Sequence, residues 1–253
     1  MTLKYYHAEP AANSLKSMIP LHEKGLAFES IYVDLHKFEQ HSDWFVKINP
    51  EGQVPVLDHD GAIITHTTVI NEYLEDVFPD VPLRPADAVG KARVRAWNKW
   101  VDEHVMNFVS MHGWHRMVGV IARNIDSGDF EKLLENIPLP DQRKKWMNAR
   151  SGFSEADLAH ATDKIIYAVD KVEKQLGETQ WIAGDMYTTA DINFYSMCGM
   201  MVERMFPEME IATRCPRLVA WREAMNARPG VEAALAMPDH TAPGLRTFTG
   251  HVR

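Results

Sequence analysis

Two threonines and a proline-containing apolar segment are the residues of this chain best suited to bind a small anion. Thr67 and Thr68 stand at the expected start of a helix, where hydroxyls and unpaired backbone N–H groups can bind a carboxylate. Residues 53–57, Gln-Val-Pro-Val-Leu, precede them. Because proline supplies no N–H to a sheet, this segment belongs at a strand start, an edge or a bulge. Together these features predict a site for a peptide-like anion.

The residues around this segment predict a tight turn and a hairpin. A valine before proline takes an extended conformation, and X-Pro is the one peptide bond that is cis at modest cost. We therefore expect a cis Val54-Pro55 bond leading into a strand. Asp60-Gly61 follows, flanked by apolar pairs, which is a strong signal for a two-residue hairpin turn.

The elements that must position this site form an α/β unit over residues 1–82. Strand-like and helix-like segments alternate there in the order β-α-β-α-β-β-α, which predicts a thioredoxin-like domain with a mixed sheet. Pro20 lies inside the first expected helix, where it should kink or interrupt it. Prolines then punctuate a linker over residues 78–85. The expected segments are Leu3–Tyr6, Leu15–Lys24, Phe28–Val33, Trp44–Ile48, Val56–His59, Ala62–Ile64 and Val69–Val77.

Residues 88–240 predict an all-helical C-terminal domain. Apolar residues recur at helical spacing from Val89 to Met111, which indicates one long helix, and a polar, basic insertion then runs to Gly152. A helix should follow Ser154 as its N-cap, and Thr188-Thr189-Ala190-Asp191 matches a capping box. A further helix opens at Pro216 and stops at Arg228-Pro229. Residues 241–253 should form an irregular tail.

Composition bounds the class of protein. The 253 residues, with 45% hydrophobic and 25% charged side chains, fit two globular domains of a soluble protein. A formal net charge of −8 argues against non-specific binding of nucleic acid or anionic membranes, and no apolar run approaches a membrane span. Cys198 and Cys215 form neither a CxxC pair nor a disulfide framework, which favours a reducing, cytoplasmic compartment.

The motifs, in this order and spacing, resemble the glutathione S-transferase superfamily over nearly the whole chain. The resemblance rests on residues 53–57 and on Thr188-Thr189-Ala190-Asp191-Ile192. Longer strings at residues 12–16, 37–45 and 72–79 are similar to the bacterial glutathione-dependent β-etherases of lignin breakdown. The family resemblance implies glutathione as co-substrate, an aromatic electrophile as substrate, and a homodimer or a heterodimer with a similar subunit.

The resemblance also implies roles for residues in the first half of the chain. Ser14, with Asn13, would stabilise the glutathione thiolate at the head of the first helix; a plain N-cap is the alternative for both. The backbone of Val54 would pair with the cysteinyl unit of glutathione. Thr67 would bind the γ-glutamyl carboxylate, unless its hydroxyl only caps the helix. Gln40 and His41 would contact the glycyl end, or lie in the loop without contact.

One position departs from the family pattern. The acidic residue that pairs with the α-ammonium of glutathione is replaced by His66, and an imidazole supplies no negative charge. This raises three alternatives: a β-etherase, a general glutathione transferase for other electrophiles, or a catalytically impaired subunit of a heterodimeric β-etherase. No metal is predicted, although His104, His112 and His115 recur at helical spacing. Phe108, Met111 and Trp114 are expected in the core or at the aromatic pocket.

Overall fold

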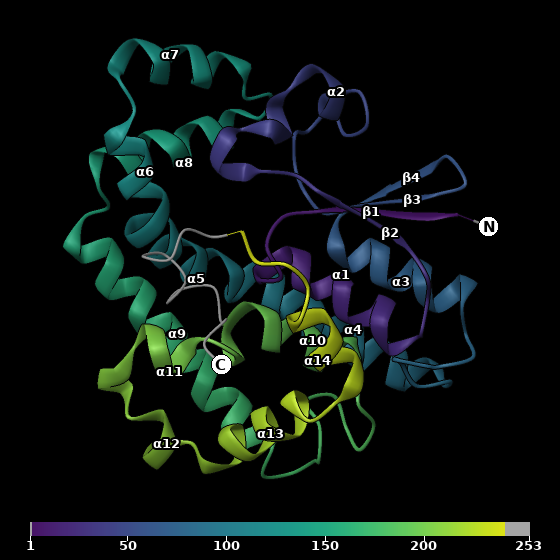
Figure 1. Ribbon diagram of the computed structural model, residues 1–253. Helices are drawn as coiled ribbons and strands as arrows, with labels where there is room; N and C mark the ends of the chain where they lie inside the picture. Colours follow the sequence, from purple (N-terminus) through teal and green to yellow (C-terminus); the bar gives the residue numbers. More distant parts are fainter. Residues whose placement is uncertain (1, 241–253) are drawn as a thin grey trace.

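The computed structural model of the protein describes residues 2–240, which form a small mixed sheet with helices followed by an all-helical half (Figure 1). The expected irregular tail, residues 241–253, lies outside the described residues. Over residues 88–240 the structure contains helices and one isolated bridge, Trp181 to Gly184, but no β-strand. The predicted division into a mixed-sheet unit and a helical unit is confirmed.

The sheet has the strand order β2-β1-β3-β4. β1 runs parallel to β2 and antiparallel to β3, and β3 pairs with β4 through a hairpin. The turn residues Asp60 and Gly61 have φ of 50° and 91°, the positive values that a two-residue hairpin turn requires. The Val54-Pro55 bond is cis and leads directly into β3, as predicted. The strands are β1 (Leu3–His7), β2 (Glu29–Tyr32), β3 (Val56–His59) and β4 (Ala62–Thr65).

Helices cover both faces of this sheet because its side chains alternate between them. Tyr5 and Leu57 point into the main core, which α1 and α3 share with the helical half, whereas Tyr6 and Val56 pack beneath α2 on the other face. The helices of this half are α1 (Ala12–Glu23), α2 (Asp43–Val46) and α3 (Thr67–Val77), with short 3-10 turns η1 (Leu35–Lys37) and η2 (Glu39–His41).

Pro20 lies inside α1 without interrupting it, so the expected interruption is wrong. A proline at position 20 removes the N–H that would bond to the carbonyl of Lys16, four residues earlier. The side-chain amide of Asn71, on α3, donates to this Lys16 carbonyl at 3.0 Å instead. The helix therefore continues because a neighbouring helix satisfies the freed acceptor.

The long helix expected from Val89 is two helices, α4 (Ala88–His104) and α5 (Met106–Gly113), which meet at Val105. Val105 has a φ of −113°, away from helical values, and is itself buried. Val101 before the break and Val109 after it are both buried in the shared core. The apolar periodicity therefore continues across the break and could not reveal it.

The polar insertion forms two helices, α7 (Ser127–Asn136) and α8 (Pro140–Ser151), which share a small core with α6 (Gly119–Asn124). Phe38, from the first half, packs on Trp146 of α8 with ring centroids 4.5 Å apart. Phe38 has a φ of 59°, which is uncommon for a bulky residue. In Figure 1 these helices reach across toward the segment around α2.

Two predicted helix starts of the helical half are confirmed. The hydroxyl of Ser154 accepts from the N–H of Asp157 at 3.1 Å, and Thr188 and Asp191 form the capping box. The methionines at 197, 200, 201 and 205 are buried in the main core. The remaining elements are η3 (Trp114–Val118), α6 (Gly119–Asn124), α9 (Glu155–Gln175), α10 (Thr189–Phe194), η4 (Tyr195–Gly199), α11 (Val202–Met205), η5 (Pro207–Met209), α12 (Ile211–Arg214), α13 (Pro216–Asn226) and α14 (Pro229–Leu235).

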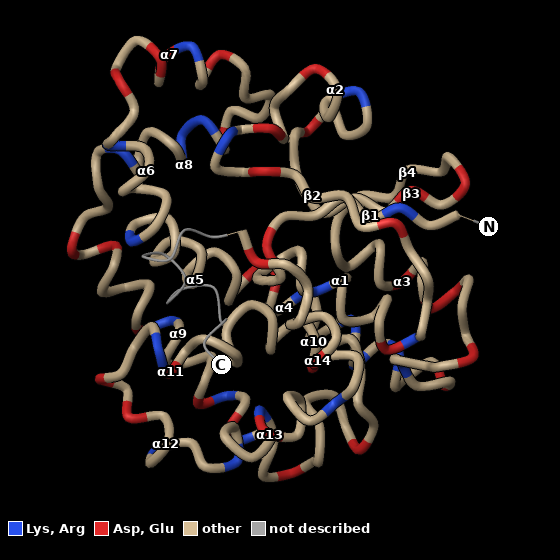
Figure 2. Tube along the Cα trace, in the orientation of Figure 1, with Lys and Arg blue, Asp and Glu red and all other residues tan. Residues whose placement is uncertain are grey.

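Among residues 2–240, no helix combines the length and the apolar character that crossing a bilayer demands. Basic and acidic residues are both spread over the two halves of the chain (Figure 2).

The bond between Asn71 and the Lys16 carbonyl can be tested with a double-mutant cycle. Asn71→Ala should lower the free energy of unfolding by about 1–3 kcal/mol, because it leaves a buried carbonyl without a donor. Pro20→Ala restores an N–H to the helix, so Asn71→Ala should cost less in that background. Urea unfolding of the four proteins measures both effects. Strictly additive losses would contradict the compensation.

Candidate functional site

A cleft lies where the start of α1, the loop before β3 and the start of α3 meet the helical half. Four of the predicted site residues line it together: Asn13, Val54, His66 and Thr67. Three others, Ser14, Gln40 and His41, are absent from its walls. The lining residues are Asn13, Lys16, Asn49, Glu51, Gln53, Val54, Pro55, Thr65, His66, Thr67, Thr68, Asp102 and Met106.

Asn13 and Ser14 lie at the head of α1 but neither caps it. Ala11 is the N-cap residue, without a side-chain cap bond, and Ala12 follows with a φ of 45°. The plain N-cap interpretation is therefore wrong for both. Ser14 is buried, and its hydroxyl oxygen accepts from the N–H of Ala8 at 3.1 Å. Asn13 lines the cleft, and its Oδ1 has no hydrogen-bond partner within residues 2–240.

The loop before β3 offers free backbone groups to the cleft. Asn49 fixes its shape: its Nδ2 donates to the carbonyl of Gln53 at 2.7 Å, and its Oδ1 accepts from the N–H of Glu51 at 3.1 Å. The N–H and C=O of Val54 bond to no described residue. An extended peptide can therefore pair with Val54 as an added strand would.

The start of α3 is open to an anion. His66 occupies the N-cap position with a φ of 64°, but its side chain makes no cap bond to the first turn. Thr67 is the first helical residue and lines the cleft. N–H groups at a helix start that lack a side-chain cap are ready donors for a carboxylate. His66 itself is exposed, and its Nε2 lies 3.8 Å from Oε2 of Glu51.

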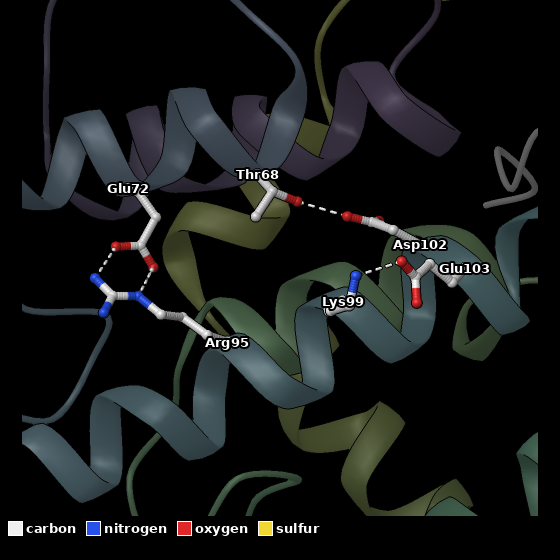
Figure 3. A pocket seen from close by; sticks show the side chains of 6 residues that line it. All are labelled: Thr68, Glu72, Arg95, Lys99, Asp102 and Glu103. Atoms are coloured by element: carbon white, nitrogen blue, oxygen red, sulfur yellow. Dashed lines mark hydrogen bonds and ion pairs between the residues drawn. The ribbon is translucent and has the colours of Figure 1, made fainter.

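Lys16 and Asp102, which both line the cleft, form an ion pair that the sequence analysis did not identify. Lys16 is 1% exposed, and its Nζ lies 2.8 Å from Oδ1 of Asp102 on α4. Thr68 donates to the other carboxylate oxygen at 2.6 Å (Figure 3), and Asn193 donates to Oδ1 at 3.2 Å. Burial lowers the pKa of Lys16, and Asp102 opposes that shift. The available signal was a lysine within the buried face of α1, which requires a partner.

Gln40 and His41 lie in η2, beside the Asn49–Gln53 loop but behind the cleft wall. Gln40 is buried, and its Oε1 has no partner among the described residues. His41 packs against Gly52: a Cβ at that position would lie 2.5 Å from Nδ1 of His41. Burial lowers the pKa of His41 to about 4. Their contact with the glycyl end stays a prediction.

The aromatic and histidine side chains of the helical half are largely engaged in packing. Trp114 packs on Trp146, and Phe108 contacts His160, so both contribute to the interior of this half. His112 lies 3.1 Å from the hydroxyl of Thr162. Over residues 2–240 no three His, Cys, Asp or Glu side chains gather as a metal site would need.

The burial of His41 predicts a pH dependence of stability. The folded protein holds His41 neutral down to about pH 4, whereas an unfolded histidine takes up a proton below about pH 6.5. The contribution of neutral, buried His41 to the free energy of unfolding is therefore fully present above pH 6.5 and is lost as the pH falls toward 4. Thermal unfolding between pH 4 and 7 should lose less stability in His41→Gln than in wild type. Parallel losses would contradict the burial of this imidazole.

Known proteins share this architecture. Residues 1–76 match the family described as "Glutathione S-transferase, N-terminal domain" and residues 140–237 match "Glutathione S-transferase, C-terminal domain". Protein LigF of Sphingobium sp. strain SYK-6 is 44% identical over 92% of each chain, and glutathione S-transferase 3 of Zea mays is 26% identical over 92% of this chain and 93% of its own.

Solved structures agree with these matches. The crystal structure of β-etherase LigF from Sphingobium sp. strain SYK-6 superimposes with a TM-score of 0.89 at 42% identity, covering 94% of this chain and 100% of that one. The two domain matches, the 44% identity over nearly the full length and the common fold lead to one conclusion: this chain belongs to the glutathione S-transferase family.

Proposed function

We propose that this protein is a glutathione-dependent β-etherase, which cleaves β-aryl ether ketones of the kind found in lignin. The observation that carries the proposal is the similarity to LigF, whose crystal structure is described as that of a β-etherase. The family membership supports glutathione as the co-substrate. The two cysteines are free and buried, which fits the cytoplasm as its compartment.

The cleft supports one orientation of glutathione. Its cysteinyl backbone would pair with Val54, whose N–H and C=O are free of described partners. Its γ-glutamyl carboxylate would bind the hydroxyl of Thr67 and the open first turn of α3. The glycyl end would then extend toward the loop with Gln40 and His41. Residues 1–82 form the proposed glutathione domain, and residues 88–240 the helical domain.

The reaction is a displacement at carbon. The sulfur of the glutathione thiolate bonds to the β carbon, the bond from that carbon to the ether oxygen breaks, and the oxygen leaves as an aryloxide that is then protonated. The neighbouring carbonyl activates the carbon toward attack. The protein must supply a thiolate near neutral pH, although a free thiol has a pKa of about 8.5, and hold the two reactants in line.

Asn13 is the side chain best placed to stabilise that thiolate. It lines the cleft at the positive end of α1, and its amide can donate to an anion there. The hydroxyl of Ser14 is directed to the backbone of Ala8 and is buried, so we assign it to the support of the turn before α1.

Asn13→Ala should slow aryl-ether cleavage by about 10- to 100-fold at pH 6, since one donor to an anion is worth up to about 10³-fold in rate. The loss should shrink toward pH 9.5, where solvent alone deprotonates the thiol. Steady-state cleavage of a β-aryl ether ketone across this pH range is the measurement.

Ser14→Ala is the matched comparison and should lose less activity at every pH, with some loss of thermal stability. A larger or more pH-dependent loss in Ser14→Ala than in Asn13→Ala would assign the thiolate to Ser14 instead. Complete inactivity of the wild type, with glutathione bound, would favour an impaired subunit that works with a competent partner.

We also propose that the protein is a dimer, formed by α3, α4 and β4. Apolar side chains are unusually exposed there: Val69 on α3 is 53% exposed, Val89 on α4 70% and Ile63 on β4 43%. On α3 and α4, Glu72 pairs with Arg95 and Lys99 with Glu103 (Figure 3), and these charged side chains can complement a second copy.

Light scattering at micromolar concentration should give about twice the chain mass of 28.8 kDa. Val69→Asp should shift the species toward the monomer, because it buries an unpaired charge in the interface. A monomeric wild type would contradict the proposed assembly.

A further inference from the structure

Because His66 supplies no negative charge, another group must bind the α-ammonium of the γ-glutamyl unit. The identity of that group is inferred here on the basis of the proposed glutathione site. The ammonium and the α-carboxylate sit on the same carbon. A carboxylate bound at the first turn of α3 therefore holds the ammonium within a few ångströms of residues 66 and 67. A primary ammonium taken from water into a cleft needs a carboxylate or several acceptors beside it.

Two carboxylates line the cleft, Glu51 and Asp102. The charge of Asp102 is already matched. Lys16 lies 2.8 Å from one of its oxygens, and Thr68 donates to the other at 2.6 Å. Asn193 adds a third donor at 3.2 Å. A second cation at Asp102 would compete with a lysine that is 1% exposed and has no other ion-pair partner in the described chain.

Glu51 is the cleft carboxylate that is free to bind a further cation. Its only ion-pair partner within residues 2–240 is His66, at 3.8 Å, and its side chain is 43% exposed. Its backbone is held in place, because Asn49 accepts a hydrogen bond from the N–H of Glu51 and donates to the carbonyl of Gln53. Oε2 of Glu51 faces Nε2 of His66, the residue immediately before Thr67.

We infer that Glu51 supplies the negative charge that binds the γ-glutamyl ammonium, beside His66, whose Nε2 lies 3.8 Å from Oε2 of this carboxylate. The ammonium then lies between the loop before β3 and the start of α3, bound by an acid from a different element than the family pattern uses. In this arrangement the site selects thiols that carry a primary amine next to the α-carboxylate.

Calorimetric titration with two ligands tests this inference: glutathione, and its desamino analogue, in which a glutaryl group replaces γ-glutamyl. Wild type should bind glutathione about three- to tenfold more tightly than the analogue. Glu51→Gln should lose that factor for glutathione and keep its affinity for the analogue, since only one ligand carries the ammonium. Glu29→Gln is the matched control, because Glu29 is also an exposed carboxylate 3.8 Å from a basic nitrogen, that of Lys4. It should bind both ligands as wild type does.

Two results would overturn the inference. The first is a Glu51→Gln protein that still prefers glutathione by the wild-type factor. The second is an Asp102→Asn protein that is folded and loses the preference while Glu51→Gln retains it, which would assign the ammonium to Asp102. Absence of binding of either ligand to wild type would instead refute the proposed function, so the two failures are distinguishable.

Discussion

The ion pair between buried Lys16 and Asp102, whose side chain is 29% exposed, joins the two halves of the chain beside the cleft. Lys16 cannot be left unpaired at 1% exposure, and its partner Asp102 comes from α4 of the helical half. The pair links α1 to α4, and Thr68 donates to the same carboxylate, so the start of α3 is linked to α4 as well. Asn13 precedes Lys16 on α1 and Thr67 precedes Thr68 on α3, so these contacts hold both cleft-lining residues beside the helical half.

The parts of the fold that depend only on neighbouring residues could be predicted from the sequence. The Val-Pro bond, the Asp60-Gly61 turn and the Thr188 capping box each depend on a few neighbouring residues, so the sequence was sufficient. Long-range compensation was not visible. The carbonyl that Pro20 leaves without a partner in the helix accepts instead from Asn71, fifty-one residues later. The break at Val105 leaves the apolar period unchanged, so no pattern could report it.

The same distinction between local and long-range determinants applies to single residues of the site. Adjacent polar residues at a helix start are equivalent in a sequence, but the backbone at Ala12, with a φ of 45°, decides which of them reaches the cleft. Asn13 does and Ser14 does not. The loop of Val54, which offers free backbone groups to the cleft, was easier to predict because a proline and a glycine mark it. Lys16 and Asp102 were missed because each acquires its role only from the other.

The contact between Phe38 and Trp146 has a consequence for how the protein can be divided. The small core of α6, α7 and α8 is completed by an aromatic ring that the first half of the chain supplies. A fragment that contains only the helical half would lose this ring and the amine that neutralises Asp102. Its exposed tryptophan and uncompensated carboxylate would favour self-association over independent folding. The boundary between the mixed-sheet half and the helical half is therefore a poor place to cut the chain. If whole halves are exchanged between relatives, the pairs Lys16–Asp102 and Phe38–Trp146 should be kept matched.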